Sequence, residues 1–532
     1  MVFKKQLSNT KKLAINSAID CMNSGKIKEA LKTIQNNFSK SSDIYLFFKG
    51  WEAQLQNNHV KAIKLFEQSL LKNPLREDTL IGLAASYSEL GDYTRARECA
   101  EQAIMLNSNS TQSLLALGTI ISKSEPKNVA VQECAMEYLT KAFDICIAEQ
   151  PDNSAILVDI MSGIGACYLN QKLNEQAKQV LETAVCIDKF NVIAHKNLAS
   201  VYANLRMIPQ AIESVKIAQM TEDVEDKIDA IYQEGMLQLM LGNYSKGWRL
   251  HEFRLHSNKY KHKDLFIGEM LNFKALTQHD SVLLFQEQGL GDFLQFSRYI
   301  PIISERCKNI DIVIFPNTYL PINDEVPSIR HFVELNYGAY IRNIYIKSVD
   351  SIPQDYTYYA SVMSLPHLLN TDIPSTLPFI TDKVSDIVGD VAIFYAGSTH
   401  HSNDSNRSMP INYVKKLIEQ NPEIVFVNMQ LQNDLSEYSN VIHPDNAGLE
   451  TMLAILKRCK LLISVDSMIV HLAGGANIRT AVLHAYSSDW RWGIDKQKSE
   501  WYPSIVNIRQ PKIGDWDSVL NEVQLLVNSI KK

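Results

Sequence analysis

The stretch AIKLFEQSLLKNP, residues 62–74, decides how the first half of the chain folds. It opens with the pattern A-x-x-x-[FA]-x-x-[SA], and the same pattern returns 34 residues later in ARECAEQA, residues 96–103. The same interval separates three further small residues, Gly50, Ala84 and Gly118. A fixed period of this length is typical of an array of similar structural units, each too small to bury its apolar face alone.

The offset of 34 continues further along the chain. It separates the pairs Gly165 and Ala199, Tyr168 and Tyr202, Ala177 and Ala211, and Ala184 and Ala218. Small residues at this spacing let two helices cross closely, while large ones such as Phe66 fill the spaces between units. Gly91 and Gly242 stand in turns where a positive φ is expected. The third unit carries an insertion, since Ala135 stands where position 130 is expected.

This pattern resembles the tetratricopeptide repeat, which implies an α-solenoid of antiparallel helix pairs. About seven pairs fit between residues 9 and 254. Solenoids of this kind present a concave groove, so we expect a polypeptide partner there. The alternative is a spacer or dimerisation surface, which leaves a homo-oligomer open.

Composition excludes several classes of protein. Charged residues make up 21% of the chain and hydrophobic residues 45%, as in folded domains rather than disordered ones. A net charge of -6 argues against a nucleic-acid partner. No cysteine pair has C-x-x-C spacing, and no apolar run is long enough for a signal peptide or a membrane span. We therefore expect free thiols and a cytoplasmic protein.

The sequence changes character after the array. Residues 255–280 form a polar, Lys-rich connector, and short apolar runs then alternate with helical stretches. We expect strands at Val282–Phe285, Ile312–Phe315, Val391–Phe394, Ile424–Val427, Leu461–Val465 and Ala481–His484. Alternating strands and helices predict parallel sheets covered on both faces. Residues 281–385 and 386–532 each have room for one Rossmann-like domain, and two such domains face a cleft.

Three loops at predicted strand ends carry polar groups. The first contains Gly289, Gly291 and Asp292, where the glycines let the backbone approach a ligand and Asp292 is either a helix cap or a catalyst. The second contains Arg407, a good phosphate partner, and Ser408. Two adjacent histidines in it, His400 and His401, lie near Asp404, but their spacing fits no metal site and we expect none.

The third loop begins at a strand end and runs into a helix. Asp466, Ser467 and the amides that follow are suited to a nucleotide, and His471 either reaches a phosphate or packs inside its helix. Tryptophans gather near the end of the chain, at Trp490, Trp492, Trp501 and Trp516. We expect them mainly in packing, with Trp490 or Arg491 at the edge of the cleft.

Together these loops resemble bacterial proteins that join tetratricopeptide repeats to a module related to the heptosyltransferases of lipopolysaccharide assembly. The resemblance covers essentially the whole chain. It rests on Gly242-Asn243-Tyr244, Gly247-Trp248-Arg249, Glu287–Asp292, Arg298–Pro301, Asn403–Ser408, Val465–Ser467, His471–Gly474, Asp489–Trp492, Trp501–Pro503 and Gly514–Trp516. It implies a GT-B fold, an α/β architecture of two Rossmann-like domains, and a metal-independent, inverting glycosyltransferase with no cofactor beyond the nucleotide-sugar donor.

The resemblance also implies roles for single residues. Asp292 becomes the general base toward the acceptor hydroxyl, and Arg407 neutralises the leaving phosphate. The residues of the nucleotide-sugar site become Gly289, Gly291, Arg407, Ser408, Asp466, Ser467, Met468 and His471. Met468 departs from the small residue usual there, which narrows the pocket, and Tyr395 replaces a Trp.

The leading hypothesis is a protein O-glycosyltransferase whose repeats capture a polypeptide, with flagellin as the first acceptor expected from the family. A second hypothesis is an enzyme that acts on a glycan or lipid-linked acceptor. A third is a repeat adaptor without catalytic activity. The donor sugar, its base and the acceptor cannot be read from the residues.

Overall fold

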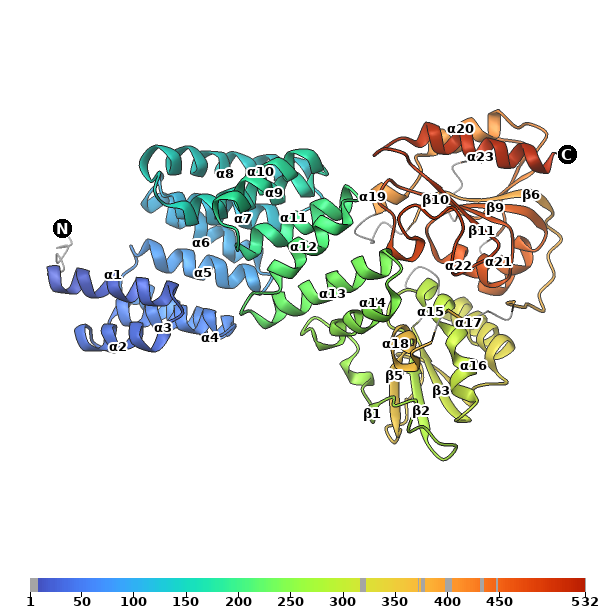
Figure 1. The fold of residues 1–532 in the computed structure, drawn as a ribbon, viewed down its shortest axis with the longest axis horizontal. Helices are drawn as coiled ribbons and strands as arrows, with labels where there is room; N and C mark the ends of the chain where they lie inside the picture. Colours follow the sequence, from blue (N-terminus) through green and yellow to red (C-terminus); the bar gives the residue numbers. More distant parts are fainter. Residues whose placement is uncertain are drawn as a thin grey trace. The chain divides into compact units, whose positions relative to one another are not determined.

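The chain folds into two units, residues Met1–Thr221 and Glu222–Lys532. The computed structural model describes residues 8–315, 322–371, 373–374, 378–397, 404–430, 435–445 and 448–531, without the side chains of residues 322–327 and 405. Figure 1 shows helices throughout the first unit and parallel sheets with helices in the second. No helix among the described residues is long and apolar enough to cross a membrane.

The first unit consists of helix pairs that follow the period found in the sequence. Its helices are α1 Asn9–Asn23, α2 Ile27–Asn37, α3 Asp43–Leu55, α4 His59–Lys72, α5 Glu77–Glu89, α6 Tyr93–Leu106, α7 Thr111–Ser124, α8 Val129–Glu149, α9 Ser154–Asn170, α10 Asn174–Ile187, α11 Val192–Asn204 and α12 Ile208–Ala218. The insertion predicted in the third unit is absorbed by α8, which has 21 residues.

Small residues on one helix of a pair receive a large side chain from the other. A Cβ added to Gly50 of α3 would lie 2.6 Å from Cε1 of Phe66 in α4, and one added to Gly82 of the next pair would lie 2.7 Å from the same ring. Phe66 is fully buried between the two pairs. The same arrangement brings Gly165 of α9 against Leu181 of α10. Close crossing of helices therefore explains why glycine and alanine recur at the repeat interval.

Both turn glycines predicted from the sequence have positive φ, +78° at Gly91 and +81° at Gly242. The eight cysteines are free, as expected. Cys146, Cys167 and Cys307 are buried, and Cys186 is exposed.

The second unit opens with a helix pair, α13 Val224–Met240 and α14 Tyr244–His251. We predicted an array that extends to residue 254, but this pair belongs with the α/β part of the chain. The reason is the Trp248 ring in α14, which is buried and packs edge-on against Phe296, Trp490 and Trp501 at centroid distances of 5.8, 5.3 and 6.3 Å.

The first sheet of this unit is parallel, in the order β1-β5-β2-β3-β4. Its strands are β1 Glu269–Met270, β2 Ser281–Phe285, β3 Asn309–Ile314, β4 Asn343–Ile346 and β5 Tyr358–Ser361. The helical segments around it are η1 Glu252–His256, η2 Lys263–Leu265, α15 Leu290–Phe296, η3 Ser297–Tyr299, α16 Ile300–Ser304, α17 Ile322–Tyr337, η4 Val362–Ser364 and α18 Leu365–Leu369.

The predicted connector, residues 255–280, is part of this first sheet rather than a free linker. Its residues form β1, which pairs with β5. Leu265 and Ile267 pack on Leu283 and Phe285 of β2, and so cover the sheet face opposite the one that faces Phe293. Burial of both faces is what a parallel sheet requires.

The second sheet is also parallel, in the order β11-β10-β9-β6-β7-β8. Its strands are β6 Gly389–Phe394, β7 Phe426–Asn428, β8 Val441–Ile442, β9 Cys459–Val465, β10 Thr480–His484 and β11 Ile505–Arg509. Its helices are α19 Asp404–Arg407, α20 Ile411–Glu419, α21 Leu449–Leu456, α22 Met468–Gly475, η5 Trp490–Trp492 and α23 Trp516–Ile530.

Alternate residues of β6 face two different cores. Val391 and Ile393 pack with α20 and α23, and Ala392 packs with α21 and α22. Figure 1 shows these helix pairs on opposite faces of the sheet. The α/β prediction is therefore confirmed at the level of two parallel sheets, and all six predicted strands are present, within one to three residues at their ends.

We expect Gly165→Ala to destabilise the array although alanine favours helix, because the added Cβ would lie 2.5 Å from Cγ of Leu181. Overpacking of this kind costs about 1–3 kcal/mol. Urea unfolding followed by circular dichroism measures it. The double variant Gly165→Ala/Leu181→Ala should lose less stability than the sum of the losses in the two single variants. The reason is that alanine at position 181 makes room for the Cβ added at position 165. Strictly additive losses would show that Gly165 is not held by this contact.

Candidate functional site

The second sheet has the strand order of a doubly wound nucleotide-binding fold. Counted from β6 as the first strand, the order is 3-2-1-4-5-6. The direction of winding reverses between β6 and β9, so the loops that follow these two strands diverge and leave a crevice at their carboxyl ends. The residues that open this crevice are Tyr395–Gly397 after β6 and Asp466–Ser467 after β9.

A cavity of about 180 Å³ lies at the carboxyl ends of β9 and β10. It is lined by Arg407, Asp466, Leu483, His484, Ala485, Ser487, Ser488 and Asp489. Two residues selected from the sequence, Arg407 and Asp466, thus come from separate loops to one cavity. The lining combines one cation with two carboxylates and two hydroxyls, so the cavity is polar.

Arg407 is held in place by its own short helix, α19. Its Nε donates to Asp404 Oδ1 at 3.3 Å, and its side chain is 17% exposed. The guanidinium lies against Gly397, where an added Cβ would come 2.5 Å from Arg407 Nε. Gly397 is therefore required for the arginine to reach the crevice.

Ser408 ties the same loop together. Its Oγ donates to Asp404 Oδ1 at 2.9 Å and accepts from Gly397 N at 2.9 Å. The resemblance implies that Ser408 belongs to the nucleotide-sugar site. The structure instead gives Ser408 a positioning role beside Arg407.

Asp466 and Ser467 stand where β9 passes into α22. Burial raises the pKa of Asp466 to about 6, with a further contribution from Asp489, while Arg491 and Arg407 oppose the shift. Ser467 is the N-cap residue of α22, yet its side chain makes no capping hydrogen bond. The first amides of α22 are thus not capped by Ser467, and helix starts of this kind favour anionic groups.

The helix with Asp292 begins earlier than the cap hypothesis requires. Gly289 is the N-cap residue of α15 and Asp292 is the third residue inside it, where a hydrogen bond from the Gly289 backbone opposes the rise of its pKa. Asp292 is therefore not the N-cap residue itself, although its side chain bonds to the backbone at the start of the helix.

Gly291 serves helix packing rather than ligand approach. A Cβ at this position would lie 3.1 Å from His471 Cδ2 and 3.2 Å from Met468 Cα. The start of α15 thus rests on the first turn of α22, in which Met468 is half-buried. Gly289 has room for a methyl group, with Asp292 Oδ2 at 3.4 Å as its nearest neighbour. The structure therefore brings Gly289, Gly291, Asp292, Met468 and His471 together as one contact between the two sheets.

Arg491, which we expected only at the edge of the cleft, connects the two sheets. It forms ion pairs with Asp292 and with Asp489, the second at 2.8 Å, and its Nε donates to Gln295 Oε1 at 2.8 Å. Its guanidinium stacks over Trp490 at 4.4 Å. Burial raises the pKa of Asp292 while Arg491 opposes that shift. A charged residue between two tryptophans was the signal in the sequence.

His471 is a packed histidine. Its Nδ1 lies 3.0 Å from Tyr502 Oη, and its ring stacks on Trp492 at 5.7 Å. Burial, with Arg491 and Arg298 nearby, holds the pKa of His471 well below its ordinary value. Burial in this packing thus favours the neutral ring over the imidazolium.

Glu287, the other carboxylate of the first loop, already accepts hydrogen bonds from neighbouring side chains. Arg254 donates to it from Nε and Nη2, both at 2.8 Å, and Ser361 Oγ donates at 2.5 Å. All three side chains are buried. Glu287 therefore fixes the loop after β2 and is not available as a base. The four tryptophans near the end of the chain, Trp490, Trp492, Trp501 and Trp516, are buried, as expected.

His400, His401 and Asn403 lie outside the described residues. Asp404 next to them is engaged by Arg407 and Ser408.

No family model and no curated protein matches the chain. Solved structures of repeat proteins are similar to parts of it. A tetratricopeptide-repeat protein of Thermus thermophilus is 16% identical over 36% of this chain and 98% of that one, with a TM-score of 0.32. One of Parabacteroides merdae is 13% identical over 48% and 96%, with a TM-score of 0.34. The Cut9–Hcn1 complex is 17% identical over 44% and 45%, with a TM-score of 0.37. Likeness at this level carries no functional argument, and the helix pairs themselves identify the repeat architecture.

The raised pKa of Asp466 makes a testable prediction about stability. An unfolded aspartate titrates near a pKa of about 3.9. Between that value and about 6 the folded protein therefore binds the extra proton, and stability falls as the pH rises through this range. Relative to Asp466→Asn, the wild type should lose about 2 kcal/mol between pH 4 and pH 7.5. Urea unfolding followed by tryptophan fluorescence reports on the second unit, because every tryptophan except Trp51 lies there. If the unfolding free energies of the wild type and Asp466→Asn changed with pH in the same way, the raised pKa of Asp466 would be contradicted.

Proposed function

We propose that the second unit is a GT-B glycosyltransferase that moves a sugar from a nucleotide-activated donor to a Ser or Thr hydroxyl of a polypeptide bound by the repeats. The observation that carries the proposal is the meeting of loops from the two sheets. Arg491 pairs with Asp292 after β2 and with Asp489 after β10, beside the cavity that Arg407 and Asp466 line. Two parallel sheets with facing strand-end loops are what a donor and an acceptor require.

In this proposal the nucleotide occupies the crevice of the second sheet. Arg407 and the first amides of α22 bind the diphosphate, and they supply the positive potential that a metal ion supplies in other transferases. Ser408 and Asp404 hold Arg407 in place. Asp466 and the hydroxyls of Ser487 and Ser488, which line the cavity, bind the nucleoside or the sugar.

Asp292 is the general base of the proposed reaction. The acceptor oxygen forms a bond to the anomeric carbon while the bond from that carbon to the phosphate oxygen breaks. The electron pair of the broken bond leaves with the nucleoside diphosphate, and the hydroxyl proton passes to the Asp292 carboxylate. Attack opposite to the leaving group inverts the anomeric centre. Arg491 keeps Asp292 ionised, and partial burial raises its basicity.

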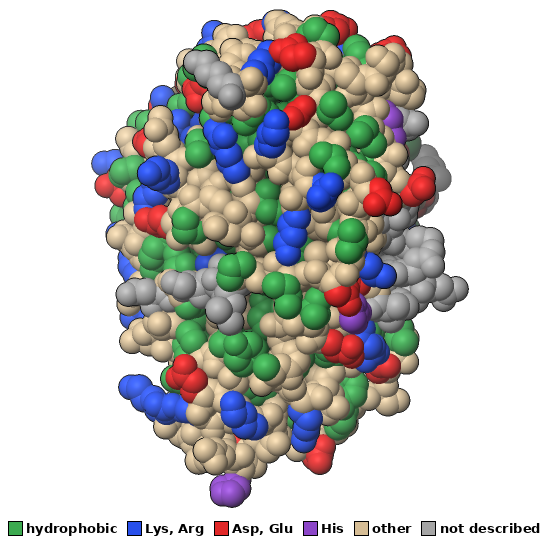
Figure 2. All heavy atoms as spheres, turned by 90° about the vertical axis from the view of Figure 1, so that its right-hand side faces the viewer, with side chains coloured by type: hydrophobic (Ala, Val, Ile, Leu, Met, Phe, Trp, Pro, Cys, Tyr) green, Lys and Arg blue, Asp and Glu red, His purple; other side chains and the backbone are tan. Residues whose placement is uncertain are grey.

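The helix pairs of the first unit are the proposed site of polypeptide capture, and flagellin is the first acceptor to test. The net charge of -6 for the whole chain argues against a general nucleic-acid binder. Figure 2 looks onto the second unit instead, where the described Lys and Arg side chains are interspersed with Asp and Glu rather than gathered into one basic patch.

Arg407→Ala should weaken binding of nucleotide diphosphates and nucleotide sugars by about 10- to 100-fold, the loss expected for one charge-assisted hydrogen bond. Isothermal titration calorimetry with a panel of nucleotide sugars measures it. Arg479→Ala is the matched control, because Arg479 is exposed and its Nη2 donates to Ser529 Oγ at 3.0 Å. Equal affinities in wild type and Arg407→Ala would remove Arg407 from the site.

Asp292→Asn should slow transfer by about 10²–10⁴-fold in protein that circular dichroism shows to be folded, because the variant also loses one carboxylate partner of Arg491. Intact mass spectrometry of an acceptor polypeptide gives the rate of transfer. The rate that remains in the variant should no longer fall at low pH, because the carboxylate whose protonation causes that fall is absent. Near-normal turnover would end the catalytic assignment. Glu287→Gln is the companion variant, expected to lower stability because it breaks the buried pair with Arg254.

The same assays separate the alternative functions. Transfer to a glycan or lipid-linked acceptor, with no modification of any polypeptide, would favour the second hypothesis. A chain that binds no nucleotide sugar would favour the repeat adaptor.

A further inference from the structure

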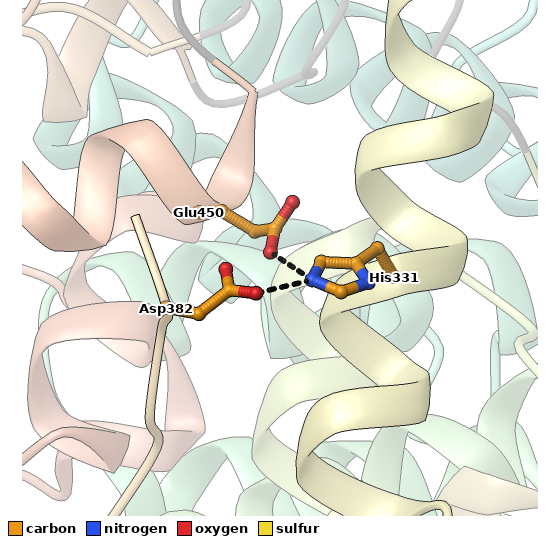
Figure 3. A group of neighbouring side chains, drawn as sticks. All are labelled: His331, Asp382 and Glu450. Carbon is orange, nitrogen blue, oxygen red and sulfur yellow. Dashed lines mark hydrogen bonds and ion pairs between the residues drawn. The ribbon is translucent and has the colours of Figure 1, made fainter. Parts of the chain in front are cut away.

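Three side chains converge at the boundary between the two α/β halves, outside the cavity described above. They are His331 of α17, Asp382 of the segment that joins the two sheets, and Glu450 of α21. Figure 3 shows both carboxylates directed at the same ring nitrogen of His331. The Nε2 atom lies 2.9 Å from Asp382 Oδ2 and 3.3 Å from Glu450 Oε1.

One nitrogen cannot satisfy both carboxylates. Nε2 carries a single hydrogen, and it is within hydrogen-bonding geometry of Asp382. Glu450 is only 3% exposed, and its Oε1 accepts no hydrogen bond from any described residue. A buried carboxylate oxygen left in this way costs several kcal/mol in general. The three side chains alone have more negative than positive charge, even with His331 protonated, and the exposed Lys383 is a further cation that acts on both carboxylates.

A divalent cation in the place of that single proton would bind all three atoms. Ligand bonds of about 2.1 Å at tetrahedral angles place ligand atoms about 3.4 Å apart. Nε2 already lies at nearly this spacing from the two oxygens, and the three ligand atoms all fall within 4.8 Å of one another. The charge of two carboxylates and a neutral imidazole is balanced by one divalent ion.

The backbone around the cluster is held independently of these side chains. Asn336 of α17 donates to Ile380 O at 3.1 Å and accepts from Ile380 N at 2.9 Å. Thr381 Oγ1 donates to Glu450 O at 3.3 Å. Ser328 of α17 lies so close to Gly448, before α21, that no side chain fits there. The backbone segments that carry the ligands are thus held together without an ion.

From this geometry we propose that His331, Asp382 and Glu450 bind a divalent transition-metal ion that clamps the two α/β halves together. One imidazole with two carboxylates suits Mn²⁺ or Zn²⁺, with water at the remaining positions. Because the ligands come from both halves and from the segment between them, the ion restricts movement of one half against the other. The site is structural, and it is separate from the metal-independent chemistry proposed for the cavity.

Titration of the full, chelator-treated chain with MnCl₂, followed by the electron paramagnetic resonance signal of free Mn²⁺, tests this site. Mn²⁺ is the probe because it prefers oxygen and imidazole ligands to the eight free thiols. We expect one saturable Mn²⁺ ion per chain, and an upward shift of the melting temperature with Mn²⁺.

Removing a ligand should abolish that behaviour. Glu450→Gln and His331→Gln should each weaken Mn²⁺ binding about tenfold or more and remove the melting shift. Glu334→Gln, one turn along α17 from His331, controls for loss of a nearby charge, and His279→Ala controls for an exposed histidine. Circular dichroism checks that each variant is folded.

Two results would overturn the proposal. One is the absence of a saturable Mn²⁺ site in the wild type. The other is equal Mn²⁺ binding in the wild type and in folded Glu450→Gln and His331→Gln, which would leave the cluster as an ion pair alone. Because the readout is metal binding, neither result depends on whether the chain transfers a sugar.

Discussion

The second unit depends on the charge balance around Arg491. A buried guanidinium is unfavourable alone, and so are the carboxylates of Asp292 and Asp489. Together they form two ion pairs in which Arg491 also donates to Gln295 and stacks on Trp490. Removing one member would leave a charge uncompensated, which typically costs about 3–5 kcal/mol. The network therefore fixes where the loops after β2 and β10 can lie, and it brings the proposed base beside the cavity of the second sheet.

Packing supports this charge network from two sides. The absence of a side chain at Gly291 allows α15 to rest on α22, so Asp292 approaches the loop of Asp466. Behind them, Trp248 carries the helix pair α13–α14 into the same aromatic cluster as Trp490 and Trp501. The buried pair of Arg254 and Glu287 then holds the loop after β2 from the side of η1. The last helix pair is consequently part of the α/β unit, although its sequence reads like a repeat.

The two functions proposed for this unit use different chemistry. Arg407 and Asp466 offer charge and hydrogen bonds inside a cavity, where a nucleotide displaces water. His331, Asp382 and Glu450 offer lone pairs at the boundary between the halves, where a cation would restrict motion. A clamp of this kind would act on the distance between donor and acceptor sites, because the reacting groups of the proposed transferase are divided between the same two halves.

The sequence by itself determined the elements and their local chemistry. A 34-residue interval of small residues fixes helix pairs, since only small side chains permit close crossing. Apolar runs such as those of β2, β6 and β9 fix buried parallel strands, and Arg407 and Asp466 could be selected because each follows such a strand. Five described strands, β1, β4, β5, β8 and β11, were not predicted; β1 and β8 have only two residues each, and the others have four or five. The place of α13–α14, the packing role of Gly291, the burial of His471 and the partnership of Arg491 with Asp292 were decided only in the tertiary structure. All four depend on contacts between residues far apart in the chain. Sequence periodicity and position at a strand end give information only about residues close together in the chain.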